Sequence, residues 1–370
     1  MMARRVMASI GTLGLMAGVL GGVGVNVSAA THGKQAVHAK TSGHRKQAVS
    51  RKKWTIVLSN NYMANEWRPQ MENDAVVVAR ELGDVNLRIV NAPNTISGQI
   101  SSLQDIIATH PNAIVVDAAS ATALNPVLEE AVRDHIVVVS FDEVVTAPHV
   151  YKLGWNYYGD GIAMANWLGY ELHGHGNIFM DLGLPGIPIS QAFVKAWNHV
   201  LKTKYPKIHV VGTYDSEYSP GPELQAISNL LAVHPNVQGV LSGAYPSSII
   251  KAFKQVGKKP LAVTGLATNG NMVTCLENHV PGFFFSAPTW VGGEAIQMAV
   301  NILEGKHEPM FSYAYTTNFQ TNANHIPGTG QVVQAKVGVN VFPKLSPALL
   351  IPISFGRFHI TPAEALGKQS

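Results

Sequence analysis

From Trp54 onward, short runs of aliphatic and β-branched residues alternate with longer segments whose apolar residues recur at helical spacing. The runs WTIVLS, LRIVN, AIVVD and IVVVSF are apolar at successive positions, so both faces of each strand are expected to be covered. The first three runs are each followed by a predicted helix, over residues 67–82, 96–109 and 120–134. This order predicts a parallel sheet with helices packed on it.

The same alternation begins again from residue 150, and the two units are expected to join near residues 153–157. The runs VYKLGW, NIFMDLG, KIHVVGTY, VQGVLSG, PLAVTG and GFFFSAP read as strands. Helices are predicted over residues 158–173, 188–203, 221–233, 246–256, 271–279 and 290–304. The sequence therefore predicts an α/β protein built from two doubly wound parallel-sheet lobes.

The lobes are expected to share the chain discontinuously. The N-terminal lobe is expected over residues 54–154 with about 288–318, and the C-terminal lobe over 155–287 with about 325–350. A tail is expected over 351–370. The Pro-rich C-terminal part contains the strand-like run ALLIPISF and, in TPAEALG, one turn of helix, and it is long enough to cross back between the lobes.

Residues 1–30 have the three parts of a secretory signal peptide. MMARR is basic, VMASIGTLGLMAGVLGGVGV is apolar and uncharged, and NVSAA offers small residues before a cleavage site after Ala29 or Ala30. An uncleaved membrane anchor is the alternative, because the apolar run is about 20 residues long. Its glycines weigh against a firm anchor.

Residues 31–53 are basic, repeat KQAV and contain no large apolar residue except Val, which predicts a disordered linker. A tether to anionic cell-surface polymers is the alternative. Residues 1–53 hold nine Lys and Arg and no acidic residue, so residues 54–370 are left with 18 basic against 23 acidic residues. A net charge of about −5 on that part argues against a nucleic-acid partner.

The single cysteine, Cys275, excludes an intramolecular disulfide and a cluster of thiolate metal ligands. No cysteine follows the apolar run, so the usual bacterial lipoprotein anchor is absent. A cysteine-poor exported chain of this size indicates a bacterial protein stabilised by its core alone.

In an open parallel sheet, ligands bind beyond the carboxyl ends of the strands. The loops expected there are rich in Asn, Asp, Ser and aromatic residues, but none contains a GxGxxG or P-loop motif. The segment SNNYMANEWR, residues 59–68, has three Asn beside Tyr, Trp, Glu and Arg. It is predicted to form one lip of a ligand cleft.

Catalytic patterns are missing from the sequence. Asp142 and Glu143 are adjacent, and in an extended segment adjacent side chains point to opposite faces, so they are not expected to form an acid/base pair. No GxSxG or HExxH motif is present, and HGH at residues 173–175 is interpreted as a solvated turn in preference to a metal site. No enzyme activity, cofactor or metal is therefore expected.

Residues 54–305 resemble the periplasmic type I sugar-binding proteins, the ribose-binding protein group that feeds ABC transporters. The resemblance rests on IVLSNNYMANEW, ISSLQDIIATHPNAIVVDAASATALNPVLEEA, IVVVSFDE, GNIFMDLGLPGIP, LLAVHPNVQGVLSGA and GFFFSAPTWVGGEAIQMAVNILEGK. It implies two lobes joined by three crossings that close over a sugar. A signal peptide stands where related DNA-binding regulators carry a helix-turn-helix, so that class is excluded.

The resemblance also implies ligand-binding positions. Asn65 and Trp67 match the family's Asn-plus-aromatic wall, with Asn60 and Asn61 as possible substitutes. Asp142 matches the Asp that accepts sugar hydroxyls.

Several polar clamps of the ribose type are replaced in this chain. The residues at those positions are Glu143, Gln191 or Phe193, Ala244 and Tyr245, Ala267, and Ala287. These replacements weaken the case for a simple pentose.

Aromatic side chains offer stacking surface for a larger or less polar ligand. The candidates are Trp67, Trp155, Tyr157, Tyr245 and Trp290. Core or hinge packing is the alternative for each of them. The full set of predicted ligand-binding residues is Asn60, Asn61, Asn65, Trp67, Asp142, Trp155, Gln191, Tyr245 and Trp290.

The resulting hypothesis is an exported, monomeric solute-binding protein that delivers a carbohydrate or related polyol to an ABC permease. A ligand-sensing periplasmic module that docks on a membrane receptor, or a binder of a non-sugar ligand such as a nucleoside, is the alternative.

Overall fold

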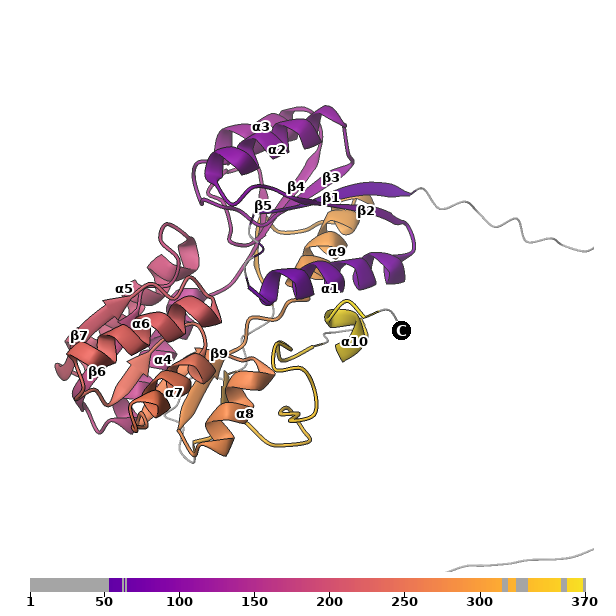
Figure 1. Cartoon of the computed structure of the whole chain (residues 1–370). Coiled ribbons are helices and arrows are strands. Elements are labelled where there is room, and N and C mark those ends of the chain that lie inside the picture. The colour runs from indigo at the N-terminus through magenta and orange to yellow at the C-terminus, as the bar shows by residue number, and fades with distance from the viewer. Residues whose placement is uncertain are drawn as a thin grey trace, which may run out of the picture. The chain divides into compact units, whose positions relative to one another are not determined.

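The computed structural model describes residues 53–61, 63, 65–314, 319–323, 332–353 and 358–368 (Figure 1). The predicted signal peptide, and the predicted linker except Lys53, lie outside the described residues.

The first sheet is six-stranded and parallel, in the order β11-β5-β4-β3-β1-β2. Its strands are β1 (Trp54–Asn60), β2 (Val85–Asn91), β3 (Ala113–Val116), β4 (Val137–Asp142), β5 (Tyr151–Gly154) and β11 (Phe311–Tyr313). Its helices are α1 (Trp67–Leu82), α2 (Ile96–Ala108), α3 (Asn125–Arg133) and α9 (Val291–Leu303). Figure 1 shows α2 and α3 on one face of this sheet and α1 with α9 on the other. All four residues of β3 are buried, as expected for a strand covered on both faces. We call this sheet with its helices the N-terminal lobe.

The second sheet is seven-stranded, in the order β13-β12-β10-β9-β8-β6-β7. Its strands are β6 (His175–Asp181), β7 (Lys207–Tyr214), β8 (Gly239–Leu241), β9 (Ala262–Leu266), β10 (Gly282–Phe285), β12 (Phe319–Thr321) and β13 (Val332–Gln334). Its helices are α4 (Tyr157–Glu171), α5 (Pro188–Thr203), α6 (Pro220–Val233), α7 (Pro246–Gln255) and α8 (Asn269–Glu277). Only the β10–β12 pair is antiparallel among the described ladders. We call this part the C-terminal lobe.

The chain passes between the two sheets three times. It leaves the first sheet after β5, returns after β10 to form α9 and β11, and leaves again between β11 and β12. The predicted α/β class with two doubly wound lobes and a three-crossing hinge is confirmed.

Two local predictions need correction. The helix predicted from residue 120 begins at Asn125, because Ser120 forms a turn in which its Oγ accepts a hydrogen bond from the Ala123 N–H at 3.2 Å. The run ALLIPISF forms no strand ladder over its described residues, 348–353; Leu350 makes only an isolated bridge with Thr268. The backbone N–H of Leu350 donates instead to a side chain, Gln70 Oε1, at 3.0 Å.

Residues 342–353 and 358–368, which we call the C-terminal strap, contact both lobes. On the C-terminal lobe, the side chain of Asn269 accepts a hydrogen bond from the Phe342 N–H at 2.8 Å and donates to the Phe342 carbonyl at 2.8 Å. The Asn269 N–H donates to the Leu349 carbonyl at 2.8 Å. These paired contacts fix the strap along the start of α8.

On the N-terminal lobe the strap contacts α1. Gln70 donates to the Ala348 carbonyl at 2.7 Å, and Asn73 donates to the Ala365 carbonyl at 2.9 Å. Ala365 ends the short helix α10 (Pro362–Ala365), whose capping box joins Thr361 and Glu364. The strap therefore links α8 with the helix that follows the polar segment after β1.

Candidate functional site

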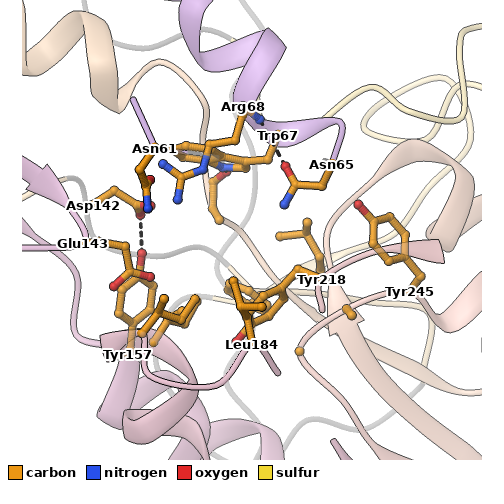
Figure 2. Close-up of a pocket in the computed structure, with 17 residues that line it drawn as sticks. Asn61, Asn65, Trp67, Arg68, Asp142, Glu143, Tyr157, Leu184, Tyr218 and Tyr245 are labelled. Atoms are coloured by element: carbon orange, nitrogen blue, oxygen red, sulfur yellow. Dashed lines mark hydrogen bonds between the residues drawn. The ribbon is translucent and has the colours of Figure 1, made fainter. Parts of the chain in front are cut away.

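A cavity lies at the carboxyl ends of strands from both sheets (Figure 2). It contains about 660 Å³ of empty space, counting the part open to solvent. Its walls come from the segments after β1 and β4, from those after β6, β7, β8 and β9, and from the crossings.

The segment between β1 and α1 supplies Asn61, Asn65, Trp67 and Arg68 to the cavity. Trp67 is the first residue of α1 and is only 6% exposed, so it is more buried than the loop position expected from the sequence. Its indole N–H donates to the Ala287 carbonyl at 2.7 Å, so its ring is fixed while it lines the cavity. Tyr62, in the same segment, lies outside the described residues.

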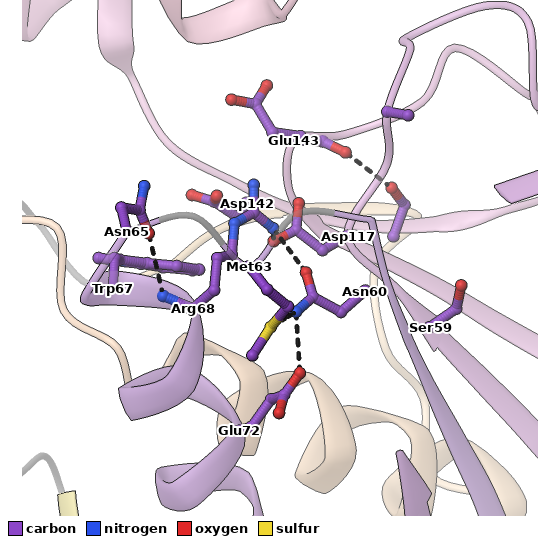
Figure 3. Close-up of polar contacts among 12 residues, drawn as sticks. Ser59, Asn60, Met63, Asn65, Trp67, Arg68, Glu72, Asp117, Asp142 and Glu143 are labelled. Atoms are coloured by element: carbon purple, nitrogen blue, oxygen red, sulfur yellow. Dashed lines mark hydrogen bonds and ion pairs between the residues drawn. The ribbon is translucent and has the colours of Figure 1, made fainter. Parts of the chain in front are cut away.

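Arg68 is buried and carries the positive charge of this wall (Figure 3). Its guanidinium forms an ion pair with Asp117 and donates to Asn60 Oδ1 at 3.2 Å. The guanidinium carbon lies 5.2 Å from the centre of the Trp67 ring, within cation–π distance. These contacts orient Arg68 along the wall next to Trp67.

Asn60 does not line the cavity, and its role as a substitute ligand residue stays a prediction. Its amide donates to Glu72 Oε1 at 2.8 Å (Figure 3). It also donates to Asn91 Oδ1 at 3.1 Å, inside the N-terminal lobe. It supports Arg68 from behind.

Asp142 and Glu143 both line the cavity, which corrects the prediction that they point to opposite faces. Asp142 ends β4 with φ of +55°, a left-handed conformation that Asp tolerates better than most residues. The chain is no longer extended there, so the alternation of side chains stops. Asp142 Oδ1 accepts hydrogen bonds from the Trp155 indole N–H at 3.0 Å and from the Tyr157 hydroxyl.

Burial dominates the charge state of these two acids. It raises the pKa of Asp142, against the lowering effects of the Arg68 charge and the hydrogen bonds from Tyr157 and Trp155. It raises the pKa of Glu143 well above its usual value, and the neighbouring charge of Asp142 adds to the effect. A carboxyl group that keeps its proton can donate a hydrogen bond as well as accept one.

Two polar atoms of this wall lack a partner among the described residues. Asn61 Oδ1 and Glu143 Oε2 are buried, and neither has a hydrogen bond to a described protein group. Most buried polar side-chain atoms in proteins are hydrogen-bonded, so such exceptions in a cavity indicate atoms that a ligand can satisfy.

The opposite wall, from the C-terminal lobe and the crossings, is mostly apolar. It contains Leu184, Ile187, Ile189, Tyr218, Gly243, Ala244, Tyr245, Leu266, Phe285 and Ala287. The Tyr218 hydroxyl lies 3.2 Å from Ser190 Oγ, and the Tyr245 hydroxyl donates to Glu66 Oε2 of the N-terminal lobe.

A second pair of buried acids, Asp181 and Glu223, lies behind this wall. Asp181 accepts hydrogen bonds from the Gly183 N–H at 2.8 Å and from the Ser216 N–H and hydroxyl at 3.1 and 2.8 Å. Glu223 accepts from the hydroxyls of Tyr214 and Ser242 at 2.8 and 2.7 Å.

Burial, with a further contribution from Asp181, raises the pKa of Glu223 to about 8. The backbone N–H of Tyr245 donates to Glu223 at 2.5 Å, and that of Gly243 donates to Asp181 at 3.3 Å. The two acids therefore hold the loops that form the apolar wall.

The structure brings five predicted ligand-binding residues to the cavity: Asn61, Asn65, Trp67, Asp142 and Tyr245. Their contact with a ligand stays a prediction.

The other predicted site residues lie outside the cavity lining. Trp155 and Trp290 pack together near the crossings, with ring centres 6.3 Å apart, and their contact with a ligand stays a prediction. Gln191 is exposed on α5 and borders a separate hollow with Tyr158 and Lys195. Gln191 points away from the cavity, which is lined by Ile187, the residue before α5, and by Ile189, in the first turn of α5.

The prediction missed Arg68, Glu143, Tyr218 and the apolar segment after β6. Arg68 belongs to the segment over residues 59–68 that was predicted to form a lip of the cleft, so its charge next to Trp67 could have identified it as a site residue. Apolar loop residues such as Leu184 gave no signal, because isolated apolar residues in a sequence are usually interpreted as packing.

Within the described residues, no group of three or more His, Cys, Asp or Glu side chains is arranged to hold a metal ion. No described helix has both the length and the apolar character needed to cross a bilayer.

Comparison with known proteins identifies the family. Residues 56–307 match the sequence model of the periplasmic binding protein domain. The chain is 22% identical over 260 residues to the ribose import binding protein of Bacillus subtilis (strain 168), covering 70% of this chain and 84% of that protein.

Two solved structures share the fold. An ABC transporter solute-binding protein from Thermobispora bispora aligns with a TM-score of 0.66 and 23% identity, over 70% of this chain and 83% of that one. The binding protein of the arabinose ABC transporter from Shewanella sp. ANA-3, bound to L-arabinofuranose, aligns with a TM-score of 0.66 and 19% identity, over 72% and 91%.

A match over residues 56–307 extends across both sheets and includes every segment that lines the cavity. It bears out the expectation of a binding protein in place of an enzyme. The chain belongs to the periplasmic binding protein family.

Proposed function

We propose that the protein is an exported solute-binding protein that captures a carbohydrate or related polyol between its lobes and delivers it to an ABC permease. The observation that carries this proposal is the pair of buried atoms Asn61 Oδ1 and Glu143 Oε2, which lie on a wall beside Asp142, Arg68 and Trp67. Sugar hydroxyls both donate and accept hydrogen bonds, so they suit a wall that mixes carboxyl, amide and guanidinium groups.

The proposed ligand-binding residues have separate roles. Asn61, Asp142 and Glu143 bind hydroxyl groups, and Arg68 donates to ligand oxygens. The ring of Trp67 contacts the apolar C–H face of the sugar. Asn65 and Tyr245 border the cavity just before the starts of helices α1 and α7, respectively.

Relatives support the ligand class and the transport context. The Bacillus subtilis relative is named for ribose import, and the Shewanella structure holds L-arabinofuranose. Because these proteins are 19–22% identical to this chain, the proposal extends to carbohydrates as a class and leaves the individual sugar open.

The proposal also covers movement and location. The lobes, residues 54–154 with about 288–318 and residues 155–287 with about 325–350, close about the crossings, and the permease binds the closed form. The contact between Tyr245 and Glu66 joins the two lobes at the cavity border. Residues 1–30 direct export, and the protein acts as a monomer.

A thermal-shift and calorimetric screen of free sugars, polyols and nucleosides tests the proposal. A ligand at about 100 times its Kd raises the free energy of unfolding by about 2.7 kcal/mol. A cognate sugar or polyol should therefore raise Tm, and Glu143→Ala should reduce the shift. The matched change Glu129→Ala, on α3 and outside the cavity lining, should not. Binding of nucleosides alone, with no response to any sugar or polyol, would refute it.

A further inference from the structure

The two walls of the cavity differ in polarity. The N-terminal lobe supplies Asn61, Asn65, Arg68, Asp142 and Glu143, all with polar or charged groups. Figure 2 shows these side chains on one side of the cavity, with Leu184 and Tyr218 facing them from the other. The facing wall is built largely from Leu184, Ile187, Ile189, Leu266, Phe285 and Ala287.

The polar atoms of the facing wall are already used within the protein. The Tyr218 hydroxyl pairs with Ser190, and the Tyr245 hydroxyl donates to Glu66. Tyr157, which also lines the cavity, donates its hydroxyl to Asp142. The three tyrosines therefore present mainly ring surface to a ligand.

The backbone of this wall is engaged in the same way. The N–H groups of Gly183 and Gly243 donate to Asp181, and that of Tyr245 donates to Glu223. The hydroxyls of Ser216 and Ser242 also face these two buried acids. These N–H and hydroxyl groups of the C-terminal lobe are thus directed toward the two buried acids behind the wall.

A fully hydroxylated sugar fits these two walls poorly. Hydroxyls that meet the N-terminal lobe gain partners, including the unsatisfied atoms of Asn61 and Glu143. A hydroxyl placed against the apolar wall would lose its hydrogen bonds to water without replacement. A methyl or aryl group at the same position would instead bury apolar surface.

We propose, building on the proposed function, that the ligand is a carbohydrate with hydroxyls along one edge and an apolar substituent at the other. A deoxy sugar and a glycoside with a methyl or aryl group share this chemistry. The hydroxyl edge binds the N-terminal lobe, and the apolar substituent packs on Leu184, Ile189 and Leu266.

Matched pairs of ligands test this inference by calorimetry on the mature protein. One arm compares each 6-deoxy sugar with its parent: D-fucose with D-galactose, L-rhamnose with L-mannose, and 6-deoxy-D-glucose with D-glucose. The other arm compares methyl and phenyl glycosides with the free sugars. Because one methyl group in an apolar pocket changes discrimination about 10–200-fold, the apolar member of at least one pair should bind about tenfold tighter or more.

Two variants test whether the preference for the apolar ligand of each pair arises at the apolar wall. Leu184→Asn should cut that preference at least threefold while Tm changes little, because Leu184 lies half-buried in a loop. The control Leu261→Asn changes a residue that is 56% exposed and outside the cavity, and it should leave the preference unchanged.

Two results would overturn the inference in distinguishable ways. If the parent sugar binds as tightly as its apolar counterpart in every pair, the ligand class is wrong but the carbohydrate function stands. If no sugar, glycoside or polyol binds, the proposed function itself fails, and the inference fails with it.

Discussion

Two pairs of buried acids, one lining the cavity and one behind its apolar wall, have different surroundings. Asp181 and Glu223 accept hydrogen bonds from backbone N–H groups and hydroxyls of four neighbouring loops and strands. Asp142 and Glu143 have fewer protein donors, and Glu143 Oε2 has none among the described residues. All four acids are buried, so burial does not separate a structural acid from a ligand-binding one. The two pairs differ instead in how many of their carboxyl oxygen atoms accept a hydrogen bond from the protein.

This comparison predicts the largest loss of stability for Asp181→Ala. Several buried donors would lose their acceptor at once, and each unsatisfied donor costs about 1–3 kcal/mol. We expect the free energy of unfolding to fall by about 3–5 kcal/mol in urea titrations. A loss below about 1 kcal/mol would show that water or neighbouring groups replace Asp181, and would remove the contrast between the two pairs.

Asp142→Asn should produce the opposite result. The amide oxygen can still accept from Trp155 and Tyr157, so stability should change little, whereas a charged hydrogen bond to the ligand is worth about 1.5–3 kcal/mol. Calorimetry should show affinity lower by about one to two decades. Unchanged affinity would exclude Asp142 from the ligand contacts.

Trp67→Phe should have a mixed and smaller effect. It removes the hydrogen bond to the Ala287 carbonyl and part of the stacking surface, each worth about 1 kcal/mol. Both affinity and Tm should fall moderately, and ligand-induced fluorescence should decrease relative to the parent protein. If Tm falls and the affinity does not, Trp67 is a packing residue only.

The last prediction concerns the slope of stability against pH. The pKa of Glu223 is about 8 in the folded protein, above the value near 4.5 of an ordinary Glu. Between about pH 4.5 and pH 8 the folded state binds more protons than the unfolded state, so stability should fall as the pH rises through this window. Glu223→Gln should flatten the curve measured by urea titration, whereas Glu143→Gln should also alter the pH dependence of ligand affinity. Equal effects of both variants on affinity would erase the distinction between the pairs.

Most of the fold could be predicted because its signals are local. The apolar strands and the periodic helices are read from windows of a few residues, and they gave both lobes and the order of elements. The run ALLIPISF shows the limit of this reading. Its apolar residues pack in the strap, and Gln70, far away in sequence, takes the backbone N–H of Leu350 that a strand ladder would use.

The site was predicted less completely, for reasons that are also physical. A left-handed φ at Asp142 turned Glu143 into the cavity, and no alternation pattern contains that information. Asn60 was assigned to the cavity because it shares a segment with Asn61, but its partners Glu72 and Asn91 lie on other elements. The apolar wall could not be predicted from the sequence, because its residues are of the same types as core residues and differ from them only in facing the cavity.

The C-terminal strap also limits how the protein can be shortened. The match to the family ends at residue 307, yet β11, β12, β13 and α10 all come later in the chain. A fragment cut at that residue would remove the edge strand β11 from the first sheet and strands β12 and β13 from the second. It would also remove the last crossing and the contacts of Gln70 and Asn73 with the strap. The smallest fragment expected to fold in this way therefore begins near Trp54 and extends through α10. A fusion partner attached directly after α10 would start beside α1, the helix that carries Trp67.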